Sequence, residues 1–235
     1  MVKLSEGLEG IVDQPQPVRL LHVMPMDFDE LERRCRGELV AAGGDAAHGL
    51  AHVQRVVANA RALAAVEGAR LEVVLPAAWL HDCVTVPKDS PQRTAASRLA
   101  AAQAVDWLRG WGWPETLLPE IAHAIEAHSF SAGIAPRMIE AQVVQDADRL
   151  DALGAVGLAR CLMLGGELGR PLYVAGDPFC EQRMPDDSAA CVDHFYTKLL
   201  KLEATMQTVG GRKEAARRTE FLREFLGQLK REIGG

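Results

Sequence analysis

The segment from Leu71 to Cys83 constrains the fold of this chain most strongly, because nearly all of its residues are apolar. A helix that is apolar on every side is stable only when other elements cover it completely. Two adjacent valines, Val73 and Val74, would also allow a short strand, but the helical patterns on both sides favour a helix. We therefore expect a central, buried helix that ends at the polar pair His81–Asp82.

Helical periodicity recurs along the rest of the chain, and glycine and proline separate the segments that show it. We expect further helices over residues 27–41, 48–65, 90–109, 115–128, 136–153, 190–208 and 212–233. Five glycines at positions 154 to 169 predict an irregular segment over residues 154–187. Prolines predict a loosely ordered arm over residues 1–26. We find no linker in the remainder, so we expect one all-α domain over residues 27–235.

The composition, with 48% hydrophobic and 25% charged residues, is typical of a soluble globular protein. The net charge of −6 gives no overall attraction to nucleic acids or anionic membranes, so we expect neither as a partner. No apolar stretch reaches the roughly 20 residues that a membrane span needs. The five cysteines follow no metal-binding spacing, and we expect reduced thiols in a cytoplasmic protein.

Two histidines lie before the buried helix at a spacing that suits metal binding. His48 and His52 are four residues apart, so a helix places both imidazoles on one face, and neutral imidazole is a common metal ligand. The pair His81–Asp82 ends an apolar segment, where an unpaired charge would be costly to bury. Taken alone, the first two could be surface or core histidines, and the second pair could be an exposed helix end.

An acidic cluster near residue 150 offers carboxylates to the same ion. Asp146 and Arg149 share one face of the predicted helix, while Asp148 and Asp151 share another, so the spacing does not show which carboxylate binds. A solvated acidic face is the alternative. Two histidines with two carboxylates suit a six-coordinate divalent ion such as Mn, Fe, Co, Ni or Mg. Structural zinc is disfavoured, because no cysteine joins the set.

The order of these residues, H…HD…D on successive helices, resembles that of the HD-domain metal-dependent phosphohydrolases. Stretches over residues 81–91, 127–131, 145–154 and 194–199 are also similar to a bacterial subgroup that includes nucleotide pyrophosphohydrolases. The resemblance covers about residues 27 to 230. It implies a single-domain HD-type helical bundle and a homodimer.

The resemblance also implies roles for individual residues. The metal ligands would be His52, His81, Asp82 and Asp146; the catalytic candidates are His48, as proton donor, with Asp82 and Asp148; and the candidates for substrate contacts are Lys88, Arg93, His128, Arg149, His194 and Lys198. Whether Asp148 or Asp151 orients the ligands from outside stays open. We expect one divalent ion, manganese first with Mg, Co, Ni or Fe as alternatives, and a second ion held by His128 is a further possibility.

The function that the resemblance implies is hydrolysis of a phosphate ester or anhydride, with a nucleotide as the substrate. Our first expectation is a nucleoside triphosphate that is cleaved to monophosphate and pyrophosphate. The alternatives within the fold are a nucleotide monoester or a cyclic phosphodiester. From other classes we keep a di-iron oxygenase of the HD fold and a non-catalytic nucleotide sensor.

Overall fold

The computed structural model describes residues 27–41, 46–84, 86, 93–129 and 132–234, without the side chains of residues 46–48 and 93. The helices of these residues are α1 (Phe28–Ala41), α2 (Ala46–Glu67), α3 (Leu71–Leu80), α4 (Ala96–Gly110), α5 (Leu118–His128), α6 (Ile139–Leu150), α7 (Gly154–Glu167), α8 (Cys191–Thr197) and α9 (Val209–Glu232), with short 3₁₀ turns at Arg93–Ala95, Leu199–Lys201 and Glu203–Thr205. The described part contains helices and no strand, which confirms the predicted all-α class. The arm over residues 1–26 lies outside the described residues.

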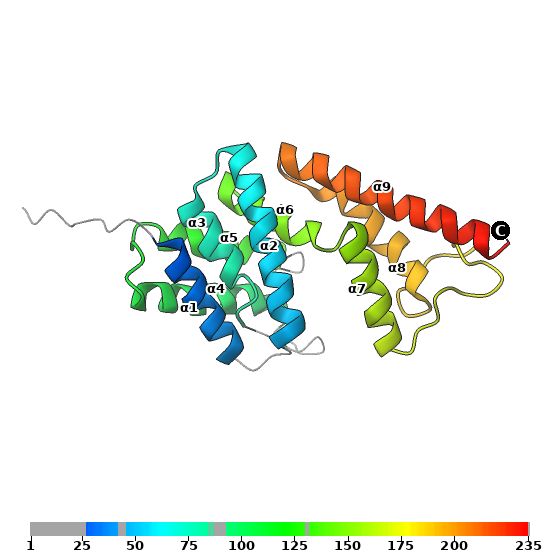
Figure 1. The fold of residues 1–235 in the computed structure, drawn as a ribbon, viewed down its shortest axis with the longest axis horizontal. Helices are drawn as coiled ribbons and strands as arrows, with labels where there is room; N and C mark the ends of the chain where they lie inside the picture. The colour runs from blue at the N-terminus through cyan, green and yellow to red at the C-terminus, as the bar shows by residue number, and fades with distance from the viewer. Residues whose placement is uncertain (1–26, 42–45, 85, 87–92, 130–131, 235) are drawn as a thin grey trace, which may run out of the picture.

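Helix α3 is the centre of the larger group of helices, as its apolar sequence predicts. Every residue from Val73 to Leu80 is buried, and the helix packs against α1, α2, α4, α5 and α6. Figure 1 shows α1 to α6 gathered at one end of the molecule, with α7, α8 and the C-terminal part of α9 at the other. Because α3 is buried, His81 and Asp82, which directly follow it, lie among the surrounding helices.

The prediction of an irregular segment over residues 154–187 is wrong in its first half, because residues 154–167 form helix α7. Two of the glycines belong to the helix for reasons of packing. A side chain at Gly157 would clash with the carbonyl oxygen of Ala152, and one at Gly165 would clash with the sulfur of Cys191. The glycines therefore permit close contacts here and do not end the helix.

The helix predicted over residues 190–208 is also shorter than expected. Helix α8 ends at Thr197, and two 3₁₀ turns lead to the start of α9. The side chain of Thr208 accepts a hydrogen bond from the amide of Gly211 and so caps α9. This cap fixes the end of the connection, and α9 then packs along α2, α6 and α7.

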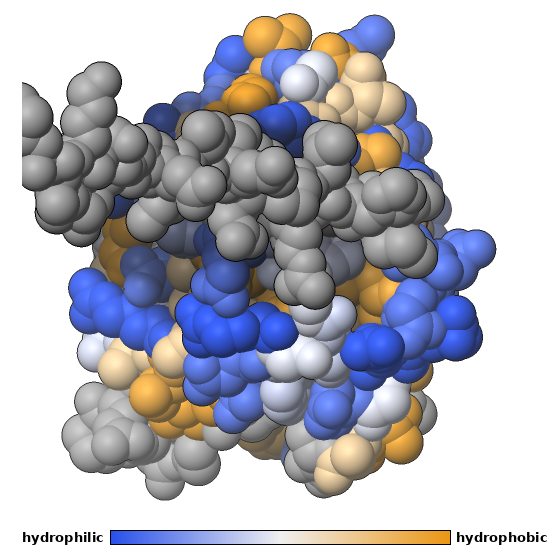
Figure 2. Space-filling view, turned by 90° about the vertical axis from the view of Figure 1, so that its left-hand side faces the viewer, coloured by the Kyte–Doolittle hydropathy of each residue, from blue (hydrophilic) through white to orange (hydrophobic). Residues whose placement is uncertain are grey.

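Hydrophilic and hydrophobic residues are interspersed over the coloured part of the surface in Figure 2, and no single apolar face is visible on that part. Within the described residues, no helix combines the length and the apolar character that crossing a membrane requires.

Candidate metal centre

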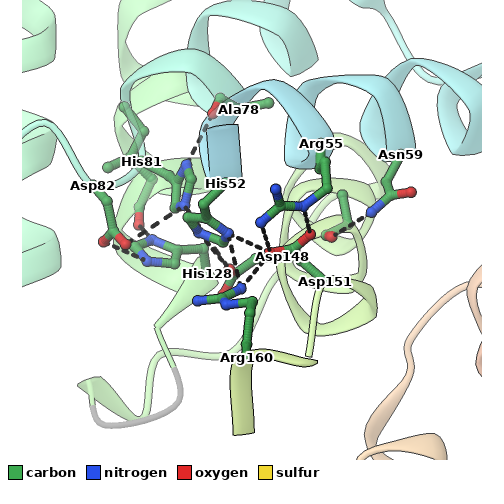
Figure 3. A network of polar contacts seen from close by, with 12 residues as sticks. His52, Arg55, Asn59, Ala78, His81, Asp82, His128, Asp148, Asp151 and Arg160 are labelled. Atoms are coloured by element: carbon green, nitrogen blue, oxygen red, sulfur yellow. Dashed lines mark hydrogen bonds and ion pairs between the residues drawn. The ribbon is translucent and has the colours of Figure 1, made fainter. Parts of the chain in front are cut away.

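Three histidines and two aspartates meet where four helices converge (Figure 3). His52 comes from α2, His81 and Asp82 follow the end of α3, His128 is the last residue of α5, and Asp148 lies in α6. Two overlapping groups could each hold an ion: His52, His81 and Asp148 form one, and His81, Asp82 and His128 form the other. In each group the ligand atoms lie within 4.8 Å of one another. We call these five residues the metal cluster.

Each histidine of the metal cluster has its Nδ1 atom engaged by an oxygen acceptor. His81 donates to the carbonyl of Ala78 at 2.9 Å, and His128 donates to the carbonyl of Ile125 at 2.6 Å. His52 lies with Nδ1 2.7 Å from a carboxylate oxygen of Asp151. A carbonyl oxygen can only accept, so His81 and His128 each carry a proton on Nδ1. The carboxylate of Asp151 holds the ring of His52 in the same way, and the Nε2 atoms of all three rings face inward.

The inward-facing atoms of the metal cluster lie close to one another. The Nε2 atoms of His52 and His81 are 3.3 Å apart, and Asp148 Oδ1 lies 3.4 Å from the first and 3.9 Å from the second. On the other side, Asp82 lies 3.6 Å from His81 Nε2 and 3.4 Å from His128 Nε2. A cation between these donors would satisfy all of them, so the residues fit a metal ion.

The ligand atoms of the metal cluster suit some ions better than others. Three imidazole nitrogens and two carboxylates suit a transition metal of the Mn, Fe, Co or Ni type, and they leave positions for water and substrate. Neither group contains a cysteine of the described chain, unlike most structural zinc sites.

The electrostatics of the metal cluster agree with a site for a cation. Burial is the main influence on His81 and lowers its pKa, which keeps the ring neutral. Burial also acts on His128, but a hydrogen bond with Asp82 and the charge of Asp148 outweigh it and raise the pKa of His128. Burial would raise the pKa of Asp82, yet the neighbouring His81 and His128 hold it below its usual value. Asp82 is therefore a carboxylate and can bind a metal.

Asp151 supports the metal cluster from outside. It is buried and accepts from Arg55, with Nε 2.6 Å from Oδ1 and Nη2 3.0 Å from Oδ2. Its Oδ2 also accepts from His52 and forms an ion pair with Arg160. Although burial opposes ionisation, the hydrogen bonds from His52 and Arg55 lower the pKa of Asp151 to about 2. Of the two carboxylates that the spacing left open, Asp148 faces the cluster and Asp151 orients His52.

Asp146, expected as a metal ligand, is placed elsewhere by the structure. Its buried carboxylate accepts from the amides of Gln207 and Thr208 and from the hydroxyl of Thr208 at 2.8 to 3.1 Å. Burial raises the pKa of Asp146, and these hydrogen bonds counteract it. Residues two apart on a helix point about 200° apart, so only one of Asp146 and Asp148 can face the cluster. That residue is Asp148.

The structure brings one of the predicted substrate residues, His128, into the metal cluster and leaves others outside it. Arg149 donates to the carbonyl of Thr205 at 2.6 Å, on the face it shares with Asp146. His194 pairs with Asp187, with Nδ1 and Oδ2 3.1 Å apart, and Lys198 is exposed. Lys88 and the side chains of His48 and Arg93 lie outside the described residues.

Two arginines beside the metal cluster were missed at the level of the sequence. Arg55 lies three residues after His52, a spacing that places both on one face of α2 and could have revealed it. Arg160 lies in a segment expected to be irregular, where no spacing argument applies. Both contact Asp151 (Figure 3).

A cavity of about 390 Å³ adjoins this arrangement but does not contain the metal cluster. Its lining comes from α2, the start of α7 and α9, and it includes Arg55, Asp151, Arg217, Arg218 and Phe221. The chemistry of the metal cluster, and not the shape of this cavity, therefore identifies the candidate site.

Comparison with known proteins agrees with this geometry. The family model described as the HD domain matches residues 49–153, a range that contains the whole metal cluster. The uncharacterized protein YpgQ of Bacillus subtilis (strain 168) is 34% identical over 192 residues, which cover 80% of this chain and 85% of YpgQ.

Solved structures show the same similarity. The crystal structure of Bacillus subtilis YpgQ in complex with ADP has a TM-score of 0.67 and 32% sequence identity, covering 88% of this chain and 95% of that one. An HD-superfamily hydrolase from Bacillus thuringiensis has a TM-score of 0.70 and 29% identity, covering 88% and 98% of the two chains. The chain therefore belongs to the HD-domain family and has the helical fold of the HD-superfamily hydrolases.

Proposed function

We propose that this protein is a divalent-metal-dependent phosphohydrolase that cleaves nucleoside triphosphates to monophosphate and pyrophosphate. The observation that carries the proposal is the metal cluster, in which three Nε2 atoms and two carboxylates face one another. A divalent ion held there supplies polarisation of a phosphoryl oxygen and activation of a water nucleophile.

The protein's own contribution is a ligand set that is oriented in advance. The carbonyls of Ala78 and Ile125 and the carboxylate of Asp151 hold the three rings with Nε2 facing inward. Arg55 fixes Asp151 with two hydrogen bonds. Such outer contacts raise the basicity of the ligands and keep them in position for the reaction.

The proposal of a nucleotide substrate is supported by a relative. The Bacillus subtilis relative was crystallised with ADP. The diphosphate of ADP contains a phosphoanhydride bond, the type of bond that we propose this protein cleaves. We propose manganese as the ion, His48 as the proton donor, and Lys88 and Arg93 as further phosphate contacts. A homodimer remains a prediction from the resemblance.

The test measures turnover and the bond that is cleaved. Protein freed of metal with a chelator is supplied with Mn²⁺, Co²⁺, Ni²⁺ or Mg²⁺ and a panel of nucleoside triphosphates, monophosphates and cyclic phosphates. In water labelled with ¹⁸O, we expect the label in the nucleoside monophosphate and unlabelled pyrophosphate. Release of inorganic phosphate alone would instead indicate a monoesterase or a different scissile bond.

Variants connect the activity to the metal cluster. We expect His52→Ala and Asp148→Asn to lose turnover, while Asp106→Asn, at an exposed aspartate of α4, keeps it. Full turnover in either cluster variant would rule out the proposed hydrolase. A wild type that binds nucleotide but hydrolyses none of the panel would point to a nucleotide sensor.

A second candidate, a di-iron oxygenase of the same fold, is favoured by one observation. It requires histidines beyond the H…HD…D set, and His128 lies in a group with Asp82 and His81 that overlaps the first. Two irons per chain in the purified protein, together with oxygen uptake, would support this candidate. One ion per chain and hydrolysis without oxygen would exclude it.

A further inference from the structure

We infer that Arg160 is a substrate-binding residue whose guanidinium contacts a phosphoryl group beside the metal cluster. The inference takes its substrate class from the proposed function and goes beyond it by naming a phosphate contact that the sequence motifs do not contain. It rests on the charge balance of Asp151, the exposure of Arg160 and its position next to His52.

Asp151 is fully paired without Arg160. Its Oδ1 accepts from Arg55 Nε at 2.6 Å, and its Oδ2 accepts from Arg55 Nη2 at 3.0 Å and lies 2.7 Å from His52 Nδ1. The bidentate contact with Arg55 already balances the negative charge of Asp151. The ion pair with Arg160 adds a second cation to the same carboxylate.

Among the described residues of the site, this second cation is surplus in the charge balance. The carboxylates of Asp82 and Asp148 would together balance one divalent ion, and Arg55 balances Asp151. In this part of the chain, Arg160 then adds a positive charge that no described carboxylate beside the metal cluster balances. A polyphosphate supplies the anion that this charge lacks, and arginine binds phosphate oxygens through paired N–H donors.

The guanidinium of Arg160 is also open to a ligand. Its side chain is 48% exposed, whereas Asp151 is 1% exposed. Among the described residues its polar contacts use the Nη1 atom only, which leaves the Nε and Nη2 donors available. Val156 and Met163, which lie about one turn on either side of it in α7, are 37% and 54% exposed.

Its position suits a phosphoryl group next to the one that reacts. Arg160 Nη1 lies 3.2 Å from Nδ1 of His52, so one imidazole ring separates the guanidinium from the inward-facing Nε2. Figure 3 shows Arg160 reaching from α7 toward His52 and Asp151. A chain of phosphates can therefore place one phosphoryl group in the metal cluster and an adjacent one on Arg160.

The test is a binding experiment on Mn²⁺-loaded wild type, Arg160→Gln and Arg160→Lys, by titration calorimetry with ADP, inorganic pyrophosphate and adenosine. Mn²⁺ alone is titrated into each metal-free protein, and thermal unfolding is recorded. Arg223→Gln, at an exposed arginine of α9 that pairs with Glu203 and Glu220, is the matched control.

We expect Arg160→Gln to weaken binding of ADP and pyrophosphate by about 10- to 100-fold, the loss of one or two hydrogen bonds to a charged group. Mn²⁺ affinity, the unfolding temperature and the binding of adenosine should match those of Arg223→Gln and the wild type. Arg160→Lys, which keeps the charge without the planar fork, should be intermediate.

Unchanged affinity of Arg160→Gln for ADP and pyrophosphate would overturn the inference. So would a parallel loss of Mn²⁺ affinity, because Arg160 would then act by positioning Asp151 and His52. A wild type that binds neither anion overturns it as well. Because no arm requires turnover, a protein that binds both anions through Arg160 but hydrolyses no nucleotide would contradict the proposed function and leave this inference standing.

Discussion

Replacing Asp146 with asparagine should lower the stability of the fold, whereas replacing Asp148 should weaken metal binding, although the two residues belong to one acidic motif. The carboxylate of Asp146 is fully buried and accepts from two backbone amides and one hydroxyl at the start of α9. Asp148 is 29% exposed, and in the described structure its contacts are with His52 and His81. The first residue holds α6 to α9, and the second faces the metal cluster.

The magnitudes follow from these contacts. A hydrogen bond to a charged group contributes about 1.5 to 3 kcal/mol, and a buried donor left without an acceptor adds to the loss. Since asparagine keeps one acceptor oxygen, we expect Asp146→Asn to lower the free energy of unfolding by about 3 kcal/mol. For a chain of this size that corresponds to roughly 6 to 12 °C in Tm.

Asp148→Asn should leave the stability of the metal-free protein within about 0.5 kcal/mol, because it removes no buried hydrogen bond. Its Mn²⁺ affinity should fall at least about 100-fold, since loss of an outer contact alone costs 10- to 100-fold. Urea unfolding followed by circular dichroism and Mn²⁺ titration of the metal-free proteins measure the two effects. The reasoning is refuted if Asp146→Asn loses Mn²⁺ binding at unchanged stability while Asp148→Asn unfolds early.

Two further predictions concern charged contacts. Asp151→Asn should weaken Mn²⁺ binding about 10- to 100-fold through the lost orientation of His52; calorimetry measures this, and wild-type affinity would contradict it. Hydrogen bonds from Arg217 and Arg218 lower the pKa of Glu214 from 4.5 to about 2. The contacts between Glu214 and these arginines therefore stabilise the fold above pH 4.5, and the stabilisation is lost as the pH falls through 2. After a discount for solvent screening, the free energy of unfolding of the wild type should exceed that of Glu214→Gln by about 1 kcal/mol at pH 6, and this difference should vanish toward pH 2. Urea titrations measure it, and a difference that stays constant with pH would contradict the prediction.

The sequence by itself determined the helical class and the central element. The apolar run ending at His81–Asp82 required a buried helix, and α3 is that helix. The order H…HD…D, and the family resemblance that it carries, predicted most of the residues of the metal cluster. His52, His81 and Asp82 are all in the cluster that the structure assembles.

Only the tertiary structure decided which carboxylate faces the metal cluster and which arginines lie beside it. Spacing shows that Asp146 and Asp148 point to different faces of one helix, but not which face meets α2 and α3; that depends on how α6 packs. The same holds for His128, whose neighbours in the cluster belong to other helices. Residue spacing could not reveal Arg160, because the glycines around it predicted an irregular segment and not helix α7. Two of these glycines permit close contacts that exist only in the folded chain.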